Sequence, residues 1–383
     1  MLNLTTLLDP APPAPEDARY GTHRPAGTAR PVVAWALTRS CNLACPHCYA
    51  ASIDHAYPAE LSLAACEAFV DDLIALPATA LLFTGGEPTR HPHLVDLISR
   101  AAAGGLRVTL STNGMAAADP AVADALAGSG LSYVGVSFDG PRELHDAFRG
   151  QVGAFDEALA GVGNLRARGM RVGLRMLLSR HLLPHLGWIL DFARAEGFGR
   201  ICAYHVVPAG RGRQATDLIP SDYALRKAVD RLIAFADELR TQAPEVEVLT
   251  VANAADGARV LGWLAEQGRD TTEAHRRLAR VGGNRAGSAF AHVTGTGDVH
   301  PDQFSWGTVA GSVTERPFSE IWRDESGLFG ELRSRQARLT GRCADCRYLD
   351  VCGGNLRARA RVLTGEPWAA DPGCYLTDSE IAA

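Results

Sequence analysis

Residues 32–49 read Val32-Val33-Ala34-Trp35-Ala36-Leu37-Thr38-Arg39-Ser40-Cys41-Asn42-Leu43-Ala44-Cys45-Pro46-His47-Cys48-Tyr49. The run from residue 32 to residue 37 is entirely apolar, which is typical of a buried strand. Three cysteines then follow within eight residues, so one loop directly after the strand carries all three thiols. Three thiolates can bind three irons of a [4Fe–4S] cube and leave the fourth iron open to a small molecule.

The alternative for these thiols is a zinc ion with His47 as its fourth ligand. Structural zinc sites usually use paired C-x2-C knuckles, whereas this run has C-x3-C-x2-C spacing. The spacing therefore favours an iron–sulfur cluster.

Short apolar runs alternate with longer helical patterns from residue 32 to about residue 207. The apolar runs predict strands at 32–38, 80–84, 107–112, 133–138, 171–178 and 201–207. Between the first two strands, one helix face is marked at 3.6-residue spacing by Leu63, Cys66, Phe69, Val70 and Leu73. Six strand–helix repeats predict an α/β fold, a partial (β/α)6 TIM-like barrel whose chemistry lies at the C-terminal ends of the strands.

Polar and glycine-rich elements follow the later predicted strands. They are Gly85-Gly86-Glu87-Pro88 after the second strand, Thr112-Asn113-Gly114 after the third, Ser137-Phe138-Asp139-Gly140 after the fourth, and Arg149 twelve residues beyond Ser137. Glycines let the backbone approach a ligand closely, and a carboxylate accepts hydrogen bonds from an ammonium group. Each element alone is more typical of a turn, but several in register on successive strands predict one ligand site.

With these elements in register, the chain resembles the radical S-adenosylmethionine (SAM) superfamily. The resemblance implies that SAM binds the open iron of a [4Fe–4S] cluster held by Cys41, Cys45 and Cys48. An electron from the reduced cluster, which an external low-potential donor supplies, then cleaves SAM, and the resulting 5′-deoxyadenosyl radical removes a hydrogen atom from the substrate. The cofactor-binding residues implied by the resemblance are His47, Tyr49, Gly85, Gly86, Glu87, Thr112, Asn113, Ser137, Asp139 and Arg149.

A second group of cysteines lies near the end of the chain, at Cys343, Cys346, Cys352 and Cys374. On spacing alone, a zinc site with four cysteine ligands is the alternative to an iron–sulfur cluster. Beside such a barrel, the pattern resembles the C-terminal auxiliary-cluster domains called SPASM or, in a shorter form, twitch. The resemblance implies a second, auxiliary [4Fe–4S] cluster at these cysteines. Four thiolates saturate it, so we expect it to move electrons and not to bind substrate.

Two residues depart from the full SPASM pattern. Asp302 follows the hairpin Gly297-Asp298-Val299-His300-Pro301 where a cysteine usually stands, and Leu356 stands four residues after Cys352 where another is expected. Seven ligands therefore predict two clusters in all. The remaining cysteines, Cys66 and Cys202, lie in apolar patterns and are predicted to be buried core thiols.

The second half of the chain carries a narrower resemblance. Its motifs read Thr250-Val251-Ala252-Asn253-Ala254-Ala255-Asp256-Gly257, Gly282-Gly283-Asn284, His300-Pro301-Asp302-Gln303-Phe304, Arg316-Pro317-Phe318-Ser319-Glu320-Ile321-Trp322, Cys352-Gly353-Gly354-Asn355 and Asp371-Pro372-Gly373-Cys374-Tyr375-Leu376. This succession looks like that of the radical SAM enzymes of haem d1 and alternative haem biosynthesis. It implies an iron tetrapyrrole as the small-molecule substrate, with removal or oxidative decarboxylation of its propionate side chains. Decarboxylation to an alkene releases one electron, which a saturated second cluster is suited to accept.

Other residues leave the exact substrate open. Ser305-Trp306-Gly307 follows Phe304 where the haem enzymes tend to have a further aromatic residue, and Arg285 stands where a small residue is expected. Candidate axial ligands of an iron tetrapyrrole are His205, His292 and His300, although a lone histidine is more often structural. Arg357 and Arg361, one helical turn apart, either meet propionates or belong to a solvated helix face.

Two other functions compete with a tetrapyrrole enzyme. One is a peptide-modifying maturase of the SPASM or twitch type. Many such enzymes carry an extra N-terminal peptide-recognition domain, for which the residues before the first predicted strand leave no room. The other is a carrier that only holds clusters or haem. Glu87, Ser137, Asp139 and Arg149 argue against the carrier, because it needs no SAM pocket.

The composition of the chain gives information about the partners that it could bind. With 38 basic and 43 acidic residues, the net charge of −5 gives no electrostatic reason to expect nucleic acid or an anionic membrane. No apolar run is long enough to span a bilayer, and residues 1–30 lack the basic start and apolar core of a signal peptide. The sequence therefore predicts a cytoplasmic enzyme, in which nine cysteines indicate metal or redox chemistry and not disulfides.

The same patterns divide the chain into four parts. Residues 1–30, with the proline-rich run at 10–15, are expected to be a flexible N-terminal segment, and residues 31–215 the radical SAM partial barrel. Residues 216–285 are expected to be a helical linker region, with a long helix at 222–240 and a short strand at 246–251. Residues 286–383 are expected to form a small α+β auxiliary iron–sulfur cluster domain that opens with a hairpin, its strands at 289–293 and 298–300.

Overall fold

The computed structural model describes residues 1–9 and 30–382. A single eleven-stranded sheet forms its framework, in the order β1-β8-β7-β6-β5-β4-β3-β2-β9-β10-β11. The strands are β1 (Leu2–Asn3), β2 (Val32–Thr38), β3 (Ala80–Gly85), β4 (Val108–Thr112), β5 (Tyr133–Ser137), β6 (Val172–Leu178), β7 (Arg200–His205), β8 (Glu247–Val251), β9 (Phe290–Val293), β10 (Asp298–His300) and β11 (Gly311–Ser312). The strands from β9 through β2 to β8 are parallel, whereas β1, β10 and β11 pair antiparallel at the two edges.

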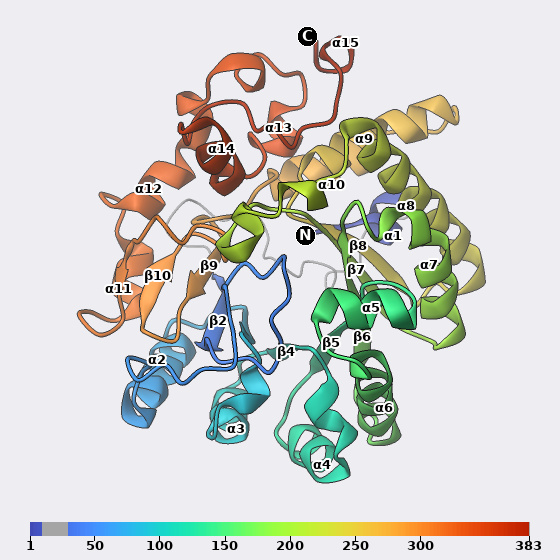
Figure 1. Ribbon diagram of the computed structural model, residues 1–383. Helices are drawn as coiled ribbons and strands as arrows, with labels where there is room; N and C mark the ends of the chain where they lie inside the picture. Colours follow the sequence, from blue (N-terminus) through green and yellow to red (C-terminus); the bar gives the residue numbers. More distant parts are fainter. Residues whose placement is uncertain (10–29, 383) are drawn as a thin grey trace.

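Helices follow the parallel strands and lie around the outside of the curved sheet (Figure 1). They are α2 (Leu63–Ala75), α3 (Leu94–Ala103), α4 (Pro120–Gly128), α5 (Arg142–Arg149), α6 (Ala154–Ala167), α7 (Leu186–Ala195) and α8 (Asp222–Gln242). Side chains satisfy free N–H groups where some of them begin, since Ser62 Oγ accepts from Ala65 N (3.3 Å) and Ser221 Oγ accepts from Ala224 N (3.3 Å). The predicted α/β partial barrel is confirmed.

All six barrel strands lie within two residues of their predicted bounds. The predicted apolar face of α2 is also buried at Cys66, Phe69, Val70 and Leu73. Leu63 is the exception: it is the first residue of the helix and is 37% exposed.

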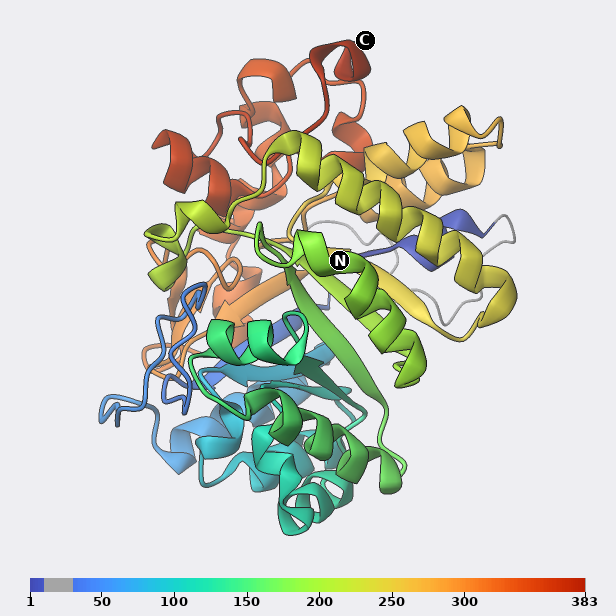
Figure 2. The same cartoon turned by 45° about the vertical axis from the view of Figure 1, so that its right-hand side comes forward.

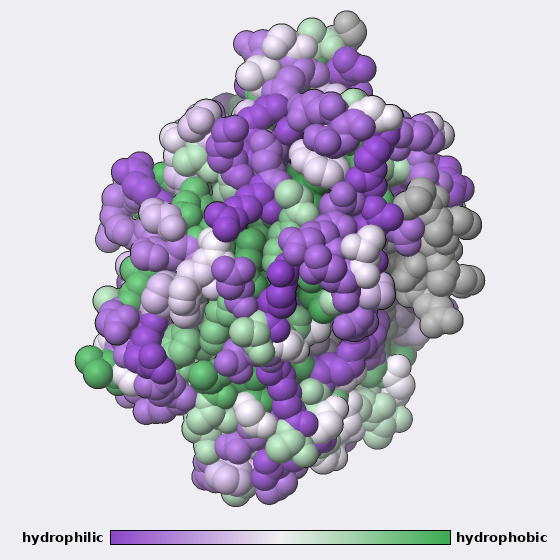
Figure 3. All heavy atoms as spheres, turned by 90° about the vertical axis from the view of Figure 1, so that its right-hand side faces the viewer, coloured by the Kyte–Doolittle hydropathy of each residue, from purple (hydrophilic) through white to green (hydrophobic). Residues whose placement is uncertain are grey.

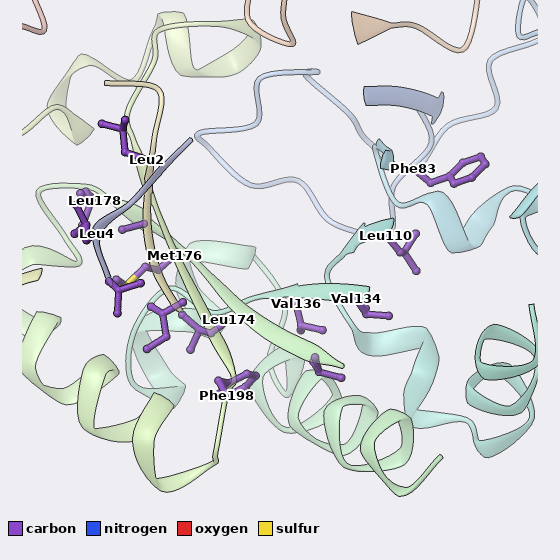
Figure 4. Packing of buried hydrophobic residues seen from close by; sticks show 14 of the residues in the cluster. Leu2, Leu4, Phe83, Leu110, Val134, Val136, Leu174, Met176, Leu178 and Phe198 are labelled. Carbon is purple, nitrogen blue, oxygen red and sulfur yellow. The ribbon is translucent and has the colours of Figure 1, made fainter. Parts of the chain in front are cut away.

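Residues 1–9 differ from the expected flexible segment. Leu2 pairs with Thr250 of β8, and helix α1 (Leu4–Leu8) follows directly. Figure 4 shows Leu2 and Leu4 among core residues of β6 such as Met176 and Leu178. The leucines of this short segment bury enough apolar surface at the edge of the sheet to offset the entropy lost in ordering it. The proline-rich run expected to be flexible lies outside the described residues.

The sheet also crosses two expected domain boundaries. Strand β8, assigned by sequence to a linker region, pairs in parallel with β7, with Ile201 opposite Val248. Strand β9 pairs in parallel with β2, with Ala34 opposite His292. The linker region therefore contributes a strand to the barrel wall, and the β9–β10 hairpin extends that wall on its other side.

Most of the helices after β8 lie at one end of the barrel (Figure 2), whereas the helix at 318–323 contacts α2 on the side of the barrel. The helices after β8 are α9 (Ala255–Glu266), α10 (Thr272–Val281), α11 (Phe318–Arg323), α12 (Leu328–Arg333), α13 (Leu349–Cys352), α14 (Arg357–Thr364) and α15 (Asp378–Ile381). Loops between these helices carry most of the C-terminal cysteines, so the structure depends there on contacts between loops.

The molecular surface is largely hydrophilic on the face drawn in Figure 3, with apolar side chains gathered in a central band. The main apolar core lies inside, between the sheet and its helices. None of the described helices is both long and apolar enough to cross a lipid bilayer.

Candidate functional site

The loop after β2 brings its three thiols together. Cys41, Cys45 and Cys48 pack in one apolar cluster with Leu43. Backbone N–H groups reach two of the sulfurs, since Leu43 N donates to Cys41 Sγ (3.4 Å) and Ser52 N donates to Cys48 Sγ (3.4 Å). Burial raises the pKa of the Cys41 thiol to about 12, so a bound cation is needed to hold it as a thiolate. This donor set fits a cationic iron cluster.

Gly85 and Gly86 let the end of β3 pass directly beneath the cysteine loop. Gly86 N donates to Thr38 O (2.8 Å), and Glu87 N donates to Ser40 O (2.8 Å). A Cβ on Gly86 would lie 2.2 Å from Ser40 O, and Gly85 has a φ of +136°. The sequence analysis expected these glycines to let the backbone approach a ligand closely. In the structure, they let it approach the start of the cysteine loop instead.

The Glu87 carboxylate joins the ends of β3 and β4. Its Oε1 accepts from Thr112 Oγ1 (2.7 Å) and its Oε2 from Asn113 N (2.8 Å). Burial raises the pKa of Glu87, although these hydrogen bonds act in the opposite direction. Asn113 Nδ2 in turn donates to Asn42 Oδ1 of the cysteine loop (2.8 Å). Glu87, Thr112 and Asn113 thus brace the loop from behind and do not line the cavities described below.

Asp139 and Arg149 form a buried ion pair after β5, with side chains 4% and 9% exposed. Burial is the largest single influence and raises the pKa of Asp139, but the Arg149 guanidinium, together with His47, His145 and the Leu177 N–H, holds that pKa below its ordinary value. Arg149 Nη1 also lies 3.7 Å from Cys45 Sγ. The Arg149 Nε is buried without a hydrogen-bond partner in the described part of the chain, so an N–H group remains for a ligand beside the cysteine loop.

A cavity of about 870 Å³, partly open to solvent, lies at the C-terminal ends of the strands. Five of the predicted cofactor-binding residues line it: His47, Tyr49, Ser137, Asp139 and Arg149. The His47 ring stacks on Phe148 with centroids 4.7 Å apart, and burial lowers the pKa of His47 to about 4, so its imidazole is neutral. Tyr49 Oη shares a hydrogen bond with Thr84 Oγ1 (3.1 Å).

A second cavity, of about 990 Å³ and also partly open, adjoins the first. The two are continuous because they share Leu82, Arg175, Tyr204, Gln303 and Phe304. The second extends to residues 250–254 at the end of β8 and just beyond it, to the loop at 283–286 and to Leu356. It lies on the side of the first cavity that faces the C-terminal region.

Arg175 is a lining residue of both cavities that the sequence did not point to. A single arginine within an apolar strand belongs to no motif. The neighbouring strand leaves room for it at Gly135, where a Cβ would lie 2.1 Å from Arg175 Nε. That glycine, opposite an arginine-bearing strand, is the only signal a sequence carries for such a side chain.

The four C-terminal thiols also converge. Cys343 is buried, and Cys346, Cys352 and Cys374 are half-buried. Burial, and then the neighbouring Cys374 and Cys343 thiols, raise the pKa of Cys352, and burial raises that of Cys374 to about 11. Tyr348 N donates to Cys346 Sγ (3.4 Å). Across the described residues, no three histidine, cysteine or acidic side chains are arranged to hold a single metal ion.

Asparagine side chains tie this thiol-bearing region to the barrel. Asn355 Nδ2 donates to Asn253 Oδ1 (2.6 Å), and Asn253 Nδ2 donates to Gly373 O (2.9 Å). Ala254 N donates back to Asn355 Oδ1 (2.8 Å). The motifs at 250–257, 352–355 and 371–376, which are far apart in the sequence, therefore meet in one buried network.

The three candidate axial histidines stand in different surroundings. His205 Nε2 lies 2.8 Å from Asp256 Oδ2, a carboxylate that also accepts from Tyr375 Oη (2.8 Å), so His205 is engaged in a structural network. His300 Nδ1 donates to Thr308 O (2.9 Å). His292 is 1% exposed, and neither of its ring nitrogens has a hydrogen-bond partner among the described residues.

Arg357 and Arg361, the two candidate propionate contacts, also differ in their burial and in their hydrogen-bond partners. Arg357 is 5% exposed and donates to Pro367 O (2.9 Å) and Ala369 O (2.7 Å). It is therefore neither a propionate contact nor part of a solvated face, because backbone carbonyls of the cysteine-bearing loops take up its donors. Arg361 is exposed and donates to Thr308 Oγ1 (2.6 Å). Cys66 and Cys202 are buried core thiols, as predicted.

Residues 35–186 match the radical SAM superfamily. The chain is 42% identical over 357 residues to the Fe-coproporphyrin III synthase of Methanosarcina barkeri, covering 92% of this chain and 89% of that protein. It is 40% identical to the pre-heme d1 synthase of Dinoroseobacter shibae, covering 92% and 88%. It is also 31% identical to the mycofactocin maturase MftC of Mycobacterium tuberculosis, covering 91% and 83%.

Solved structures share the fold at lower sequence identity. Streptococcus suis SuiB bound to its precursor peptide SuiA has a TM-score of 0.68 at 19% identity, over 90% of this chain and 76% of that one. Native anSMEcpe with bound AdoMet has a TM-score of 0.68 at 16% identity, over 90% and 94%. The chain therefore belongs to the radical SAM superfamily of enzymes, which implies a [4Fe–4S] cluster with SAM.

Proposed function

We propose that this enzyme modifies carboxylate-bearing side chains of the propionate type on an iron tetrapyrrole, either by removing them or by oxidative decarboxylation. The observation that carries the proposal is the identity of 42% and 40%, over 92% of the chain, to two enzymes named for tetrapyrrole products. The second cavity supports it. It is lined largely by apolar residues and opens into the first cavity, as is typical of a small-molecule site.

In this proposal each of the two sets of cysteines holds one [4Fe–4S] cluster. Cys41, Cys45 and Cys48 hold the cluster that binds SAM, and the auxiliary cluster is held by Cys343, Cys346, Cys352 and Cys374. When bound, the first cluster and SAM supply the 5′-deoxyadenosyl radical that takes a hydrogen atom from the substrate. Each cleavage calls for an external low-potential electron donor.

The chain's own residues then position SAM. Arg149 has a spare Nε–H for the SAM carboxylate, while Asp139 neutralises the charge on its guanidinium in the absence of that ligand. His47, Tyr49 and Ser137 line the same cavity. Glu87 acts with Gly85, Gly86, Thr112 and Asn113 to hold the cysteine loop at a fixed place beside this cavity.

A peptide-modifying maturase is the second candidate function. The 31% identity to mycofactocin maturase over 91% of the chain favours it. The lower identity ranks it behind the tetrapyrrole enzyme.

Anaerobic turnover with defined tetrapyrroles tests the proposal. The reconstituted chain is given SAM and a strong reductant, and 5′-deoxyadenosine is quantified with and without didecarboxysirohaem or iron coproporphyrin III. We expect a porphyrin-dependent rise together with a product lighter by CO2 or by a whole side chain, and the lost mass identifies the reaction. A basal 5′-deoxyadenosine yield unchanged by either porphyrin contradicts the proposal and favours the peptide substrate.

A further inference from the structure

Two arginines line the second cavity with most of their N–H groups unused. Arg175 Nη1 donates to Ser111 Oγ (2.8 Å), and Arg285 Nη1 donates to Val281 O (2.7 Å). The Nε of each arginine is buried without a hydrogen-bond partner in the described residues. Neither guanidinium forms an ion pair with a carboxylate of residues 1–9 or 30–382.

Other buried arginines have a carboxylate or several carbonyl oxygens as partners, although the Nε of Arg149 and of Arg357 also has no hydrogen-bond partner among the described residues. Arg149 pairs with Asp139, and Arg359 pairs with Asp371. Arg357 is surrounded by backbone carbonyls. A guanidinium withdrawn from water without an anionic partner is strongly unfavourable, so a cavity wall that carries two of them is built for a ligand that supplies the anions.

The remaining wall of the second cavity suits an apolar body. Its apolar lining residues include Leu82, Val251, Phe290, Phe304 and Leu356. Asp302 also lines the cavity, but its carboxylate is used within its own loop, where it accepts from Phe304 N (2.9 Å) and Ser305 Oγ (2.9 Å). A flat apolar ligand with carboxylates at its edge matches this wall, because a guanidinium binds a carboxylate through two parallel hydrogen bonds.

We propose that Arg175 and Arg285 bind two different carboxylates of the substrate. Arg175 lines both cavities, so it holds the carboxylate nearest to the SAM cavity, and Arg285 holds a second carboxylate in the part of the cavity formed by the 283–286 loop. The inference rests on the proposed function for the identity of the substrate, and it adds that binding needs at least two free carboxylates. It also makes Arg285, which stands where a small residue was expected, a residue that determines specificity.

Titration with iron coproporphyrin III tests this inference on the anaerobically reconstituted full chain. The compared variants are Arg285→Gln, Arg285→Lys and Arg175→Gln, with Arg280→Gln as the matched control, because Arg280 is an exposed arginine outside both cavities. We expect the Kd for the porphyrin to rise at least about tenfold in both glutamine variants, since each loses a charge-assisted bidentate contact. Lysine at position 285 should restore part of the affinity, and Arg280→Gln should bind like the wild type.

Turnover separates a binding role from a structural one. In Arg285→Gln we expect KM for the porphyrin to rise more than kcat falls, and esterification of the porphyrin carboxylates should weaken binding to the wild type but change little further in Arg285→Gln. An unchanged Kd in Arg285→Gln, with product still formed by the wild type, overturns the inference alone. Loss of SAM binding in Arg175→Gln assigns Arg175 to the SAM site and overturns its proposed role. Failure of the wild type to bind the porphyrin overturns the inference and the proposed function together, whereas binding without turnover counts against the proposed function only.

Discussion

The two cysteine-bearing regions of this chain are held in place in different ways. The first has three thiols in one loop after β2, and that loop rests on the backbone of Gly85 and Gly86. The second gathers four thiols from residues 343–374, and side chains distant in the sequence hold its segments together. Backbone contacts with the end of β3 thus support the first region, although the Asn113 and Arg211 side chains also donate to its loop. The second region depends more heavily on buried polar side chains, whose loss leaves partners unsatisfied.

Asp371 shows how the second region is organised. Its carboxylate accepts from Arg359 Nε and Nη2 (both 2.8 Å), from Leu356 N (2.9 Å) and from Gly373 N (2.9 Å). Arg359 Nη1 also donates to Ala252 O after β8 (3.1 Å). A single carboxylate therefore links the loop that carries Cys374 to helix α14 and, through Arg359, to the barrel.

Removing one thiol from each region should give the largest difference in activity between the two regions. Cys48→Ala should abolish SAM cleavage and lower the iron content from about eight to about four atoms per chain, because only the first cluster loses a ligand. Cys352→Ala should lose a similar amount of iron yet still cleave SAM, while product formation is impaired. Iron analysis and 5′-deoxyadenosine assays measure both effects.

The buried thiol Cys66 provides the control, because Cys66→Ala removes a sulfur from the core and no predicted ligand. Its iron content should match that of the wild type. Full product formation by either cluster variant would contradict the two-cluster assignment.

Asp371→Ala should give the largest decrease in the free energy of unfolding among these variants. It should also disrupt the second cysteine-bearing region in particular. The substitution leaves the Arg359 guanidinium, 5% exposed, without its carboxylate, which costs about 3–5 kcal/mol for a buried pair. Urea unfolding under anaerobic conditions measures the free energy, and iron analysis reports loss of the second cluster.

Asp156→Ala serves as the control for this substitution. Asp156 pairs with Arg142 at the surface, where the two side chains are 57% and 52% exposed, so the free energy of unfolding should be nearly unchanged. Equal losses in the two variants would mean that Asp371 has no special role in joining the regions.

Alanine at two glycines should disturb one region each. A Cβ on Gly86 would lie 2.2 Å from Ser40 O below the first thiol loop, and a Cβ on Gly283 would lie 1.8 Å from Cys352 O. Each clash is with backbone, so each variant should lose about 1–3 kcal/mol of stability. Gly86→Ala should lower SAM cleavage, whereas Gly283→Ala should lower the iron content of the second region.

Gly163→Ala is the matched control for the two glycine variants. Gly163 lies inside α6, and a Cβ there would meet nothing within 4 Å. Alanine should therefore raise stability by about 0.5–1 kcal/mol. Retention of both iron and SAM cleavage in Gly86→Ala and Gly283→Ala would show that the thiol loops adapt to the added methyl group.

The contrast between the regions also explains which features could be predicted from the sequence and which could not. The barrel strands and the first thiol loop were predicted from local patterns, because apolar runs and C-x3-C-x2-C spacing lie within single elements. The ordered segment at Leu2–Leu8 was missed, since its leucines gain stability only against β8, far along the chain. Arg175 and Asp256 were missed as functional or structural centres for the same reason, because their partners come from other elements.

His292 allows a smaller test, on the side of the first region. It lies beside Tyr49 and Trp306, with ring centroids 6.4 and 5.8 Å away, whereas His205 near the second region has Asp256 as a partner. Burial, reinforced by His300, lowers the pKa of His292 to about 3. Between about pH 6.5 and that value the unfolded chain binds a proton here and the folded chain does not, so stability falls as the pH falls.

His292→Gln should therefore flatten the pH dependence of the free energy of unfolding. From neutral pH down to one unit below the ordinary histidine pKa, the wild type should lose about 1.4 kcal/mol more than the variant, because one unit of pKa corresponds to that free energy. Trp306→Phe is the control: it alters the same ring cluster without a titrating group, so it should change stability equally at both pH values. Parallel pH profiles for the wild type and His292→Gln would contradict this prediction. They would mean that His292 binds a proton as readily in the folded protein as in the unfolded chain.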